Sequence, residues 1–140
     1  MDVAEKFKKD EKEFDIIIAC DTVIHFNDQI IGKPTDSEDA FRILKQLNNR
    51  EHSVYTGVTL VDSSLRSTQF HEKTHVVFGN ISDEVLHAYV ETGEPIGRAG
   101  AYGIQLKGSA LVQEVRGCYN NVVGIPIFEL VKQLRLFLKK

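Results

Sequence analysis

The chain of 140 residues has no tryptophan, one methionine, three prolines and two cysteines. Two cysteines are too few for a disulfide framework, and Cys20 and Cys118 do not have the spacing of a zinc site. Cys20 ends an apolar run, so we expect a buried free thiol and a reducing compartment. The sequence also lacks a basic excess, since 17 Lys and Arg against 20 Asp and Glu give a formal charge of −3. Nucleic acid is therefore a poor candidate partner.

Long apolar segments are also missing from the sequence, so we find neither a signal peptide nor a membrane-spanning helix in it. We expect a cytoplasmic protein that has no membrane partner. The hydrophobic content of 42% is that of an ordinary globular protein, and a chain of this length can bury about two thirds of its unfolded surface. Residues 1–140 are expected to form a single domain.

Residues 16–20 (IIIAC) are a short continuous apolar run bounded by charged residues. This pattern is typical of a strand that is buried on both faces. The run ends at Asp21, and a carboxylate just past a buried strand lies where open α/β sheets bind their ligands. A turn-forming Asp or a helix cap would have the same sequence position. Position alone leaves these alternatives open.

Strand-like and helix-like patterns alternate along the rest of the chain, which predicts a mixed-sheet α/β or α+β domain. We expect a helix after a capping box at Thr35–Glu38, a strand over 53–61, a strand over 69–78, a helix over 82–92, a strand over 111–115 and a helix from Pro126. A loop with three glycines, residues 97–103, precedes the last strand. Such a loop permits close approach to a ligand, but a tight turn is its commonest cause.

Five polar residues stand near predicted strand ends or in glycine-containing loops. They are Asp21, Lys33, Glu72, Arg98 and Gln105. Glu72 alternates with apolar residues, so its carboxylate must be hydrogen-bonded, paired or bound to a metal. Carboxylates together with cations indicate phosphate and divalent-metal chemistry. The histidines show no ligand spacing, and His71 and His75 are expected on an exposed strand face.

Seven segments carry a resemblance to a known family. They are ACDTVI (19–24), GKP (32–34), REHSVYTGV (50–58), FHEKTHVVF (70–78), YVETGEP (89–95), AGAYGIQ (99–105) and NVVGIP (121–126). In content and order they closely resemble the Maf family of nucleoside-triphosphate pyrophosphatases. The Asp-Thr pair and the Tyr-Gly-Ile-Gln string look like the branch that acts on dTTP and UTP. The resemblance extends from about Asp15 to Leu134.

The resemblance implies hydrolysis between the α- and β-phosphates of dTTP, UTP or a modified pyrimidine nucleoside triphosphate, with Mg²⁺ or Mn²⁺ as the cofactor. Asp21 would orient or deprotonate the attacking water and bind the metal, and Glu72 would be a second carboxylate of the cleft and of the metal site. Lys33 would hold phosphate, while Thr22 and Gln105 would hydrogen-bond the pyrimidine. The family implies an inosine-triphosphatase-like α/β fold with a cleft, and a homodimer.

Some positions depart from the family pattern. The family's Ser-x-Ser-Pro-Arg-Arg phosphate loop does not occur in the 140 residues, Arg98 replaces the usual Lys, and Gly97 and Cys118 stand where the family usually has Asp. We expect an N-terminally shortened fold in which backbone groups of the strand at 16–18 lack a partner, unless another chain or the N-terminal helix covers them. Two functions follow: a pyrophosphatase of weak activity, or a catalytically inactive Maf-like module that binds a nucleotide or a protein.

Overall fold

A computed structural model describes residues 1–139 of the chain. Five strands form one sheet in the order β2-β1-β3-β4-β5, and every pairing is antiparallel. The strands are β1 (Ile16–Phe26), β2 (Gln29–Ile31), β3 (Glu51–Asp62), β4 (Ser67–Phe78) and β5 (Val112–Arg116). The predicted α/β class is confirmed. Asn27 and Asp28 join β1 to β2 with positive φ angles, as a tight hairpin turn requires.

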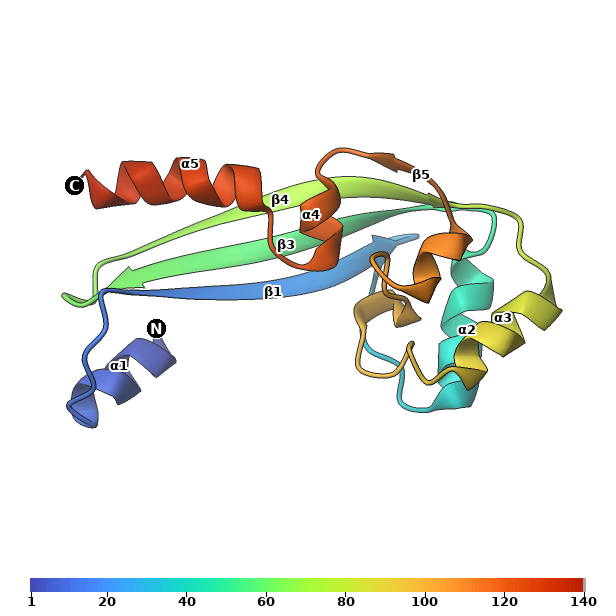
Figure 1. Cartoon of the computed structure of the whole chain (residues 1–140), viewed down its shortest axis with the longest axis horizontal. Coiled ribbons are helices and arrows are strands. Elements are labelled where there is room, and N and C mark those ends of the chain that lie inside the picture. Colours follow the sequence, from blue (N-terminus) through green and yellow to red (C-terminus); the bar gives the residue numbers. More distant parts are fainter. Residues whose placement is uncertain (140) are drawn as a thin grey trace.

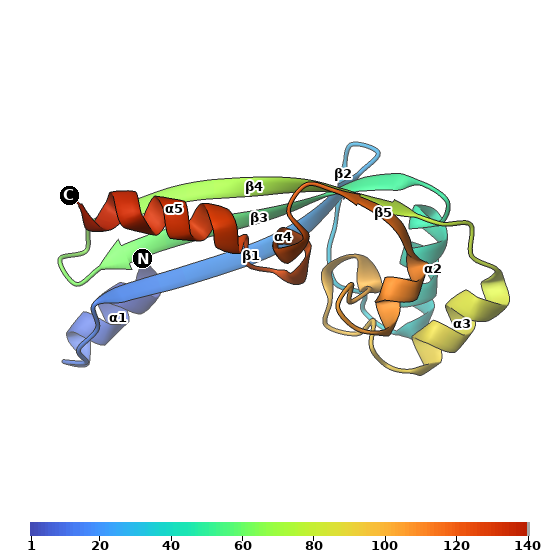
Figure 2. The same ribbon diagram turned by 45° about the horizontal axis from the view of Figure 1, so that its top comes forward.

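Most helices lie toward the two ends of this long sheet, while a short one lies beside its middle (Figure 1). They are α1 (Asp2–Lys9), α2 (Ser37–Leu47), α3 (Asp83–Glu91), α4 (Tyr119–Val123) and α5 (Ile127–Leu138). Figure 1 shows α2 and α3 together at one end, and α1 and α5 at the other end on opposite sides of the sheet. Figure 2 shows β1, β3 and β4 running the whole distance between the two groups. None of the helices in the described residues has the length and apolarity needed to cross a bilayer.

The core lies on the sheet face that carries alternate residues of β3. Val54, Thr56, Val58 and Leu60 are all buried, as the two-residue period of a strand dictates. A large apolar cluster joins this face to α2 and α3, through residues such as Leu44, Leu47, Phe78 and Leu86. A smaller cluster joins Val58 and Leu60 to Phe137 of α5. Helices thus pack on the sheet toward each end, and α4 packs on β3 and β4 between them.

The start of α2 differs by one residue from the prediction. The N-cap is Asp36, whose carboxylate accepts from the backbone N–H of Asp39 at 2.8 Å. Asp39 reaches back and accepts from the backbone N–H of Thr35 at 2.9 Å. The arrangement is a variant of the capping box, in which Asp39 accepts from the residue before the N-cap and not from the N-cap itself. The cap lies one position later than predicted because Asp39 holds the third helical position.

The prediction that residues 16–20 form a strand buried on both faces was wrong. Ile18 is 44% exposed, and Ala19 and Cys20 are exposed as well. The reason is that the packing on this part of the sheet stops short: Phe137 of α5 joins Val58 and Leu60, with Ile16 against them, and Ile18 and Cys20 stay uncovered. In addition, β2 pairs only with Ile24–Phe26, so no strand of the described chain pairs with the outer edge of residues 16–23. The expected buried thiol of Cys20 is therefore an exposed one. Asp21 does not end the strand either, since β1 continues to Phe26 and pairs Asp21 with Gly57.

Candidate functional site

A pocket of about 240 Å³ lies beside the open edge of β1. Four separate stretches of the chain build it: the middle of β1, the residue after Gly32, the glycine loop and the end of α4. Its lining includes Cys20, Asp21, Thr22, Lys33, Gly97, Arg98, Tyr102, Gly103, Gln105, Val122 and Val123. Five predicted site residues, Asp21, Thr22, Lys33, Arg98 and Gln105, therefore come together in one place.

The charge of this pocket suits a phosphate-bearing ligand. Lys33 and Arg98 are its cations, and Asp21 is the one acid in its lining. Neither cation takes part in a salt bridge within the described residues. Arg98 instead donates from Nε to the backbone carbonyl of Glu94 at 3.0 Å, which leaves its terminal nitrogens for other partners. Unpaired cations beside a carboxylate are what phosphate oxygens bind.

Glu72 does not line this pocket, which corrects its predicted place beside Asp21. In the sheet register Asp21 of β1 lies opposite Gly57 of β3, which lies opposite His71 of β4. Glu72 of β4 lies opposite Thr56 of β3, which lies opposite Thr22 of β1. Directly paired residues project from the same face of a sheet, and adjacent residues project from opposite faces. The two carboxylates thus lie on opposite faces, with β3 between their strands. They do not form one metal site.

The donor set of the pocket decides how a divalent metal could be held. Within residues 1–139 no three His, Cys, Asp or Glu side chains form a group that could hold an ion. Mg²⁺ is commonly bound by one or two carboxylates together with water and substrate phosphates. Asp21 supplies one such carboxylate. The pocket therefore fits a metal that arrives with a nucleotide, and it does not fit one held by protein ligands alone.

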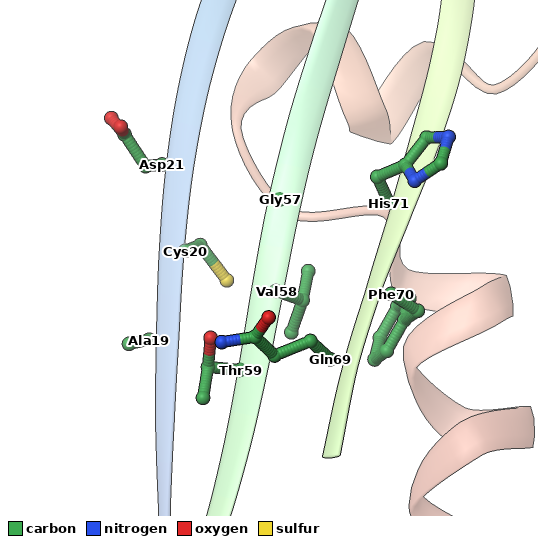
Figure 3. A pocket seen from close by; sticks show the side chains of 9 residues that line it. All are labelled: Ala19, Cys20, Asp21, Gly57, Val58, Thr59, Gln69, Phe70 and His71. Carbon is green, nitrogen blue, oxygen red and sulfur yellow. The ribbon is translucent and has the colours of Figure 1, made fainter. Parts of the chain in front are cut away.

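A second, shallower hollow of about 470 Å³ lies over the sheet and shares Cys20 and Asp21 with the pocket. Figure 3 shows the Asp21 carboxylate extending outward from β1, away from β3, with Gly57 between it and His71 on β4. A Cβ built on Gly57 would meet no atom within 4 Å. Asp21 therefore stands at the junction of two hollows, where water and a ligand can both reach it.

The glycine loop is held to α3 by a buried tyrosine and a glutamate. Tyr89 Oη donates to Glu94 Oε1 at 2.7 Å and accepts from the backbone N–H of Gly103 at 3.0 Å. The Glu94 carboxylate also accepts from the backbone N–H groups of Lys107 and Gly108. Desolvation opposes ionisation of Glu94, but these hydrogen bonds outweigh it and lower its pKa. The loop that carries Arg98 and Gln105 is thus fixed at both ends.

Gly108 has no room for a side chain at this clamp, so Gly108→Ala is expected to destabilise the fold. A Cβ there would lie 2.6 Å from the carbonyl oxygen of Gly103 and 2.7 Å from Tyr89 Oη. Because the first of these atoms is backbone, we expect a loss of about 2 kcal/mol or more in the free energy of unfolding. Urea denaturation measures it. Gly79→Ala is the matched control, since its nearest atom would be at 3.7 Å. Equal stability of the two variants would contradict the clamp.

Tyr102, which lines the pocket, is hydrogen-bonded on its buried side by His52, a histidine that no motif of the sequence indicates as a site residue. His52 Nε2 lies 2.7 Å from Tyr102 Oη, and its ring packs edge-on against Phe78. His52 is only 2% exposed, and this burial lowers its pKa to about 4. His52 directly precedes the strand predicted over 53–61 and is in phase with Val54, so its inward position follows only when that strand is extended by one residue. Its partner on a distant loop could not be read from the pattern.

Thr22 is tied to two further residues that the sequence did not single out. Its Oγ1 lies 2.9 Å from Oγ1 of Thr56, which in turn lies 3.0 Å from the backbone carbonyl oxygen of Asn121. Asn121 is fully buried in α4. Its amide nitrogen donates to the carbonyl of Val54 at 3.1 Å, which ties α4 to the central strand. The base of the pocket is therefore rigid.

Comparison with known proteins agrees with this picture. The model of the Maf family, described as Maf-like protein, matches residues 1–137. The chain is 44% identical over 138 residues to a "dTTP/UTP pyrophosphatase" of Clostridium botulinum (strain Alaska E43 / Type E3), which covers 96% of this chain and 70% of the relative. A protein of the same name from Carboxydothermus hydrogenoformans is 47% identical over 121 residues, covering 86% of this chain and 65% of the relative.

A human relative is much longer. It is named "Probable bifunctional dTTP/UTP pyrophosphatase/methyltransferase protein" and is 42% identical over 142 residues, which cover 96% of this chain and 23% of that protein. The chain spans between 63% and 70% of the length of the bacterial relatives that it matches.

Proposed function

Because this chain belongs to the Maf family, we propose that it is a nucleoside-triphosphate pyrophosphatase that hydrolyses dTTP or UTP to the monophosphate and pyrophosphate. The names of the relatives support this substrate class. The observation that carries the proposal is the pocket itself, in which Asp21, Lys33 and Arg98 lie beside Thr22 and Gln105. It combines a carboxylate, two phosphate-binding cations and two groups that can hydrogen-bond a base.

In this mechanism the chain positions the triphosphate and prepares a water molecule. Lys33 offers a compact point charge, and Arg98 offers a planar fork of N–H donors, to the phosphate oxygens. Asp21 accepts the proton of the attacking water as the new P–O bond forms. The bond between the α-phosphorus and the bridging oxygen, or that between the oxygen and the β-phosphorus, breaks at the same time. Pyrophosphate and the nucleoside monophosphate are the two products.

A divalent cation, which we propose to be Mg²⁺ or Mn²⁺, would neutralise phosphate charge and stabilise the charge that develops in the transition state. Asp21 is the residue that would hold it, together with phosphate oxygens of the nucleotide. Glu72 is left out of this proposal because it projects from the opposite face of the sheet.

The pyrimidine would be bound by Thr22 and Gln105. The Gln105 side chain is exposed and makes no hydrogen bond within the described part of the chain. Its amide offers both a donor and an acceptor, which match the alternating groups of a uracil or thymine edge. Val122 and Val123 from α4 add apolar surface to the same pocket. A pyrimidine therefore finds both polar and apolar partners there.

A nucleotide panel tests the proposed function. We expect the protein to release pyrophosphate from dTTP and UTP in the presence of Mg²⁺ or Mn²⁺, and at least about tenfold more slowly from CTP and GTP, because a misplaced hydrogen-bonding group costs about 1–3 kcal/mol. Coupled detection of pyrophosphate measures each rate. Equal rates for all four nucleotides would contradict the assignment of Thr22 and Gln105 to the base.

A second candidate function is nucleotide binding without turnover. It is favoured by one observation, that Asp21 is the single acid lining the pocket. This alternative predicts that UTP raises the melting temperature of the protein while the nucleotide stays intact. Thermal shift and pyrophosphate release, measured on the same sample, separate the two functions.

We also propose that the protein is a homodimer. The support is the outer edge of β1, where residues 16–23 have no strand partner within residues 1–139 and carry exposed apolar side chains such as Ile18. Light scattering should give about twice the chain mass of 15.8 kDa, and a single species near 15.8 kDa would contradict the dimer. A cytoplasmic location stays a prediction.

A further inference from the structure

The hydroxyl group of Thr22 is the outer end of a hydrogen-bonded chain that begins inside the protein. Thr22 lies half-buried in β1 and lines the pocket, while Thr56 beneath it is fully buried. The chain runs from Thr22 Oγ1 to Thr56 Oγ1 at 2.9 Å, and from there to the backbone carbonyl oxygen of Asn121 at 3.0 Å. Each hydroxyl has one proton to give, so the direction of these bonds can be worked out.

The direction follows from the inner end. The carbonyl oxygen of Asn121 can only accept, so the single proton of Thr56 must point to it. Thr56 then has only lone pairs left for Thr22. The Thr22 hydroxyl must therefore donate its own proton to Thr56. On the side that faces the pocket, Thr22 Oγ1 then has only lone pairs and can only accept a hydrogen bond.

Asn121 cannot easily turn away from this arrangement. Its side-chain nitrogen donates to the carbonyl oxygens of Val54 and Glu72 and to Oγ1 of Thr74, at 3.1 to 3.2 Å. Thr74 donates in turn to the carbonyl oxygen of Cys118, the residue just before α4, at 2.8 Å. Two strands thus hold α4 in place, and with it the carbonyl group that orders the Thr22 and Thr56 protons.

We infer that Thr56 is a positioning residue that fixes Thr22 as a hydrogen-bond acceptor, so that the pocket selects a base presenting an N–H group there, the imide of uracil or thymine, over cytosine. This inference rests on the proposed function and deepens it. Gln105 cannot make the same distinction, because a freely rotating amide can present either its oxygen or its nitrogen. Thr22 has no such choice while Thr56 holds its proton.

The two bases differ at the atom that matters. Uracil and thymine carry a proton on N3, between two carbonyl groups, whereas N3 of cytosine carries a lone pair. An acceptor that faces N3–H forms a hydrogen bond, and one that faces the cytosine lone pair leaves two acceptors opposed and unpaired. Such a mismatch in a site built to accept costs about 1–3 kcal/mol, which corresponds to a preference of about tenfold or more.

The test compares binding of α,β-methylene-UTP and α,β-methylene-CTP by calorimetry, since neither analogue can be cleaved at the bridge. We expect the wild-type protein to prefer the uracil analogue by at least about tenfold, and Thr56→Val to reduce that preference to about threefold or less. The reduced preference should come mainly from tighter binding of the cytosine analogue, because a Thr22 hydroxyl released from Thr56 can donate to N3 of cytosine. Thr56→Ser keeps the hydroxyl and should keep the preference.

Other outcomes overturn the inference. A Thr56→Val protein that loses affinity for both analogues equally has a structural defect only, and one that keeps the wild-type preference does not use Thr56 to order Thr22. Wild-type protein that binds both analogues equally, or neither, also overturns it. If Thr56→Val does not fold, Thr22→Val leaves the inner bond intact and must weaken uracil binding while sparing cytosine. Selective binding without pyrophosphate release would defeat the proposed function and leave this inference standing.

Discussion

Asp21→Asn is expected to lower kcat for pyrophosphate release from UTP by at least about 100-fold, because general-base catalysis contributes about 10²–10⁴ to a rate. The substitution keeps the size and one oxygen of the side chain but removes its ability to accept a proton. Asp21 lies on a paired segment of β1, opposite Gly57, so the fold should tolerate the change. Affinity for α,β-methylene-UTP, measured without a divalent cation, should stay within a few-fold of wild type.

The control for this experiment is another exposed aspartate on the same hairpin. Asp28 lies in the turn between β1 and β2 and has a positive φ angle that asparagine also tolerates. Asp28→Asn should keep the wild-type kcat. An Asp21→Asn protein as active as the Asp28→Asn protein would show that another group prepares the water.

Acidification from pH 6.5 to 4 is expected to remove about 3 kcal/mol of stability through His52 alone. Its pKa is about 4 in the folded protein and about 6.5 when unfolded. The unfolded chain therefore binds a proton in this range while the folded chain does not, so protons favour unfolding. The contribution is fully present above pH 6.5 and is lost as the pH falls toward 4. Urea denaturation at several pH values measures it.

His52→Gln should remove this pH dependence, since glutamine can still hydrogen-bond Tyr102 but does not titrate. The matched control is His71→Gln, the same substitution at an exposed histidine of β4. The pKa values of Asp39, Asp62 and Glu94 are also lowered in the folded protein. Their protonation removes further stability, but only once the pH falls below the ordinary pKa of a carboxyl group. Parallel profiles for wild type and His52→Gln would contradict a lowered pKa of His52 in the folded protein.

Most of the pocket could be predicted because its residues lie in recognisable motifs. Asp21, Lys33 and Gln105 are far apart in the chain, yet each belongs to a segment that resembles the same family. Glu72 also lies in such a segment, but the strand register puts it on the other face of the sheet from Asp21. A shift of one residue in register exchanges the two faces. Alternation within one strand predicts which of its side chains point inward. It does not predict which residue of the neighbouring strand lies opposite each of them.

The error at Cys20 has a similar cause. An apolar run predicts that side chains can be buried, but other segments decide whether they are covered. In the described chain β2 is only three residues long, so the outer edge of β1 has no neighbour along residues 16–23. Thr56 lies within the strand predicted over 53–61 and His52 directly precedes it, and in the structure both belong to the buried alternate set of β3. Their partners, Asn121 and Tyr102, are more than 45 residues away, beyond the reach of any local pattern.

The identity of the phosphate products tests the central claim most directly. Incubation of the protein with UTP and Mg²⁺, followed by phosphorus NMR, should show UMP and pyrophosphate appearing in equal amounts, and the Asp21→Asn sample should show almost none. This result would place the cleavage between the α- and β-phosphates and assign it to the pocket. UDP and inorganic phosphate as the products, or intact UTP in the presence of folded wild-type protein, would contradict the account.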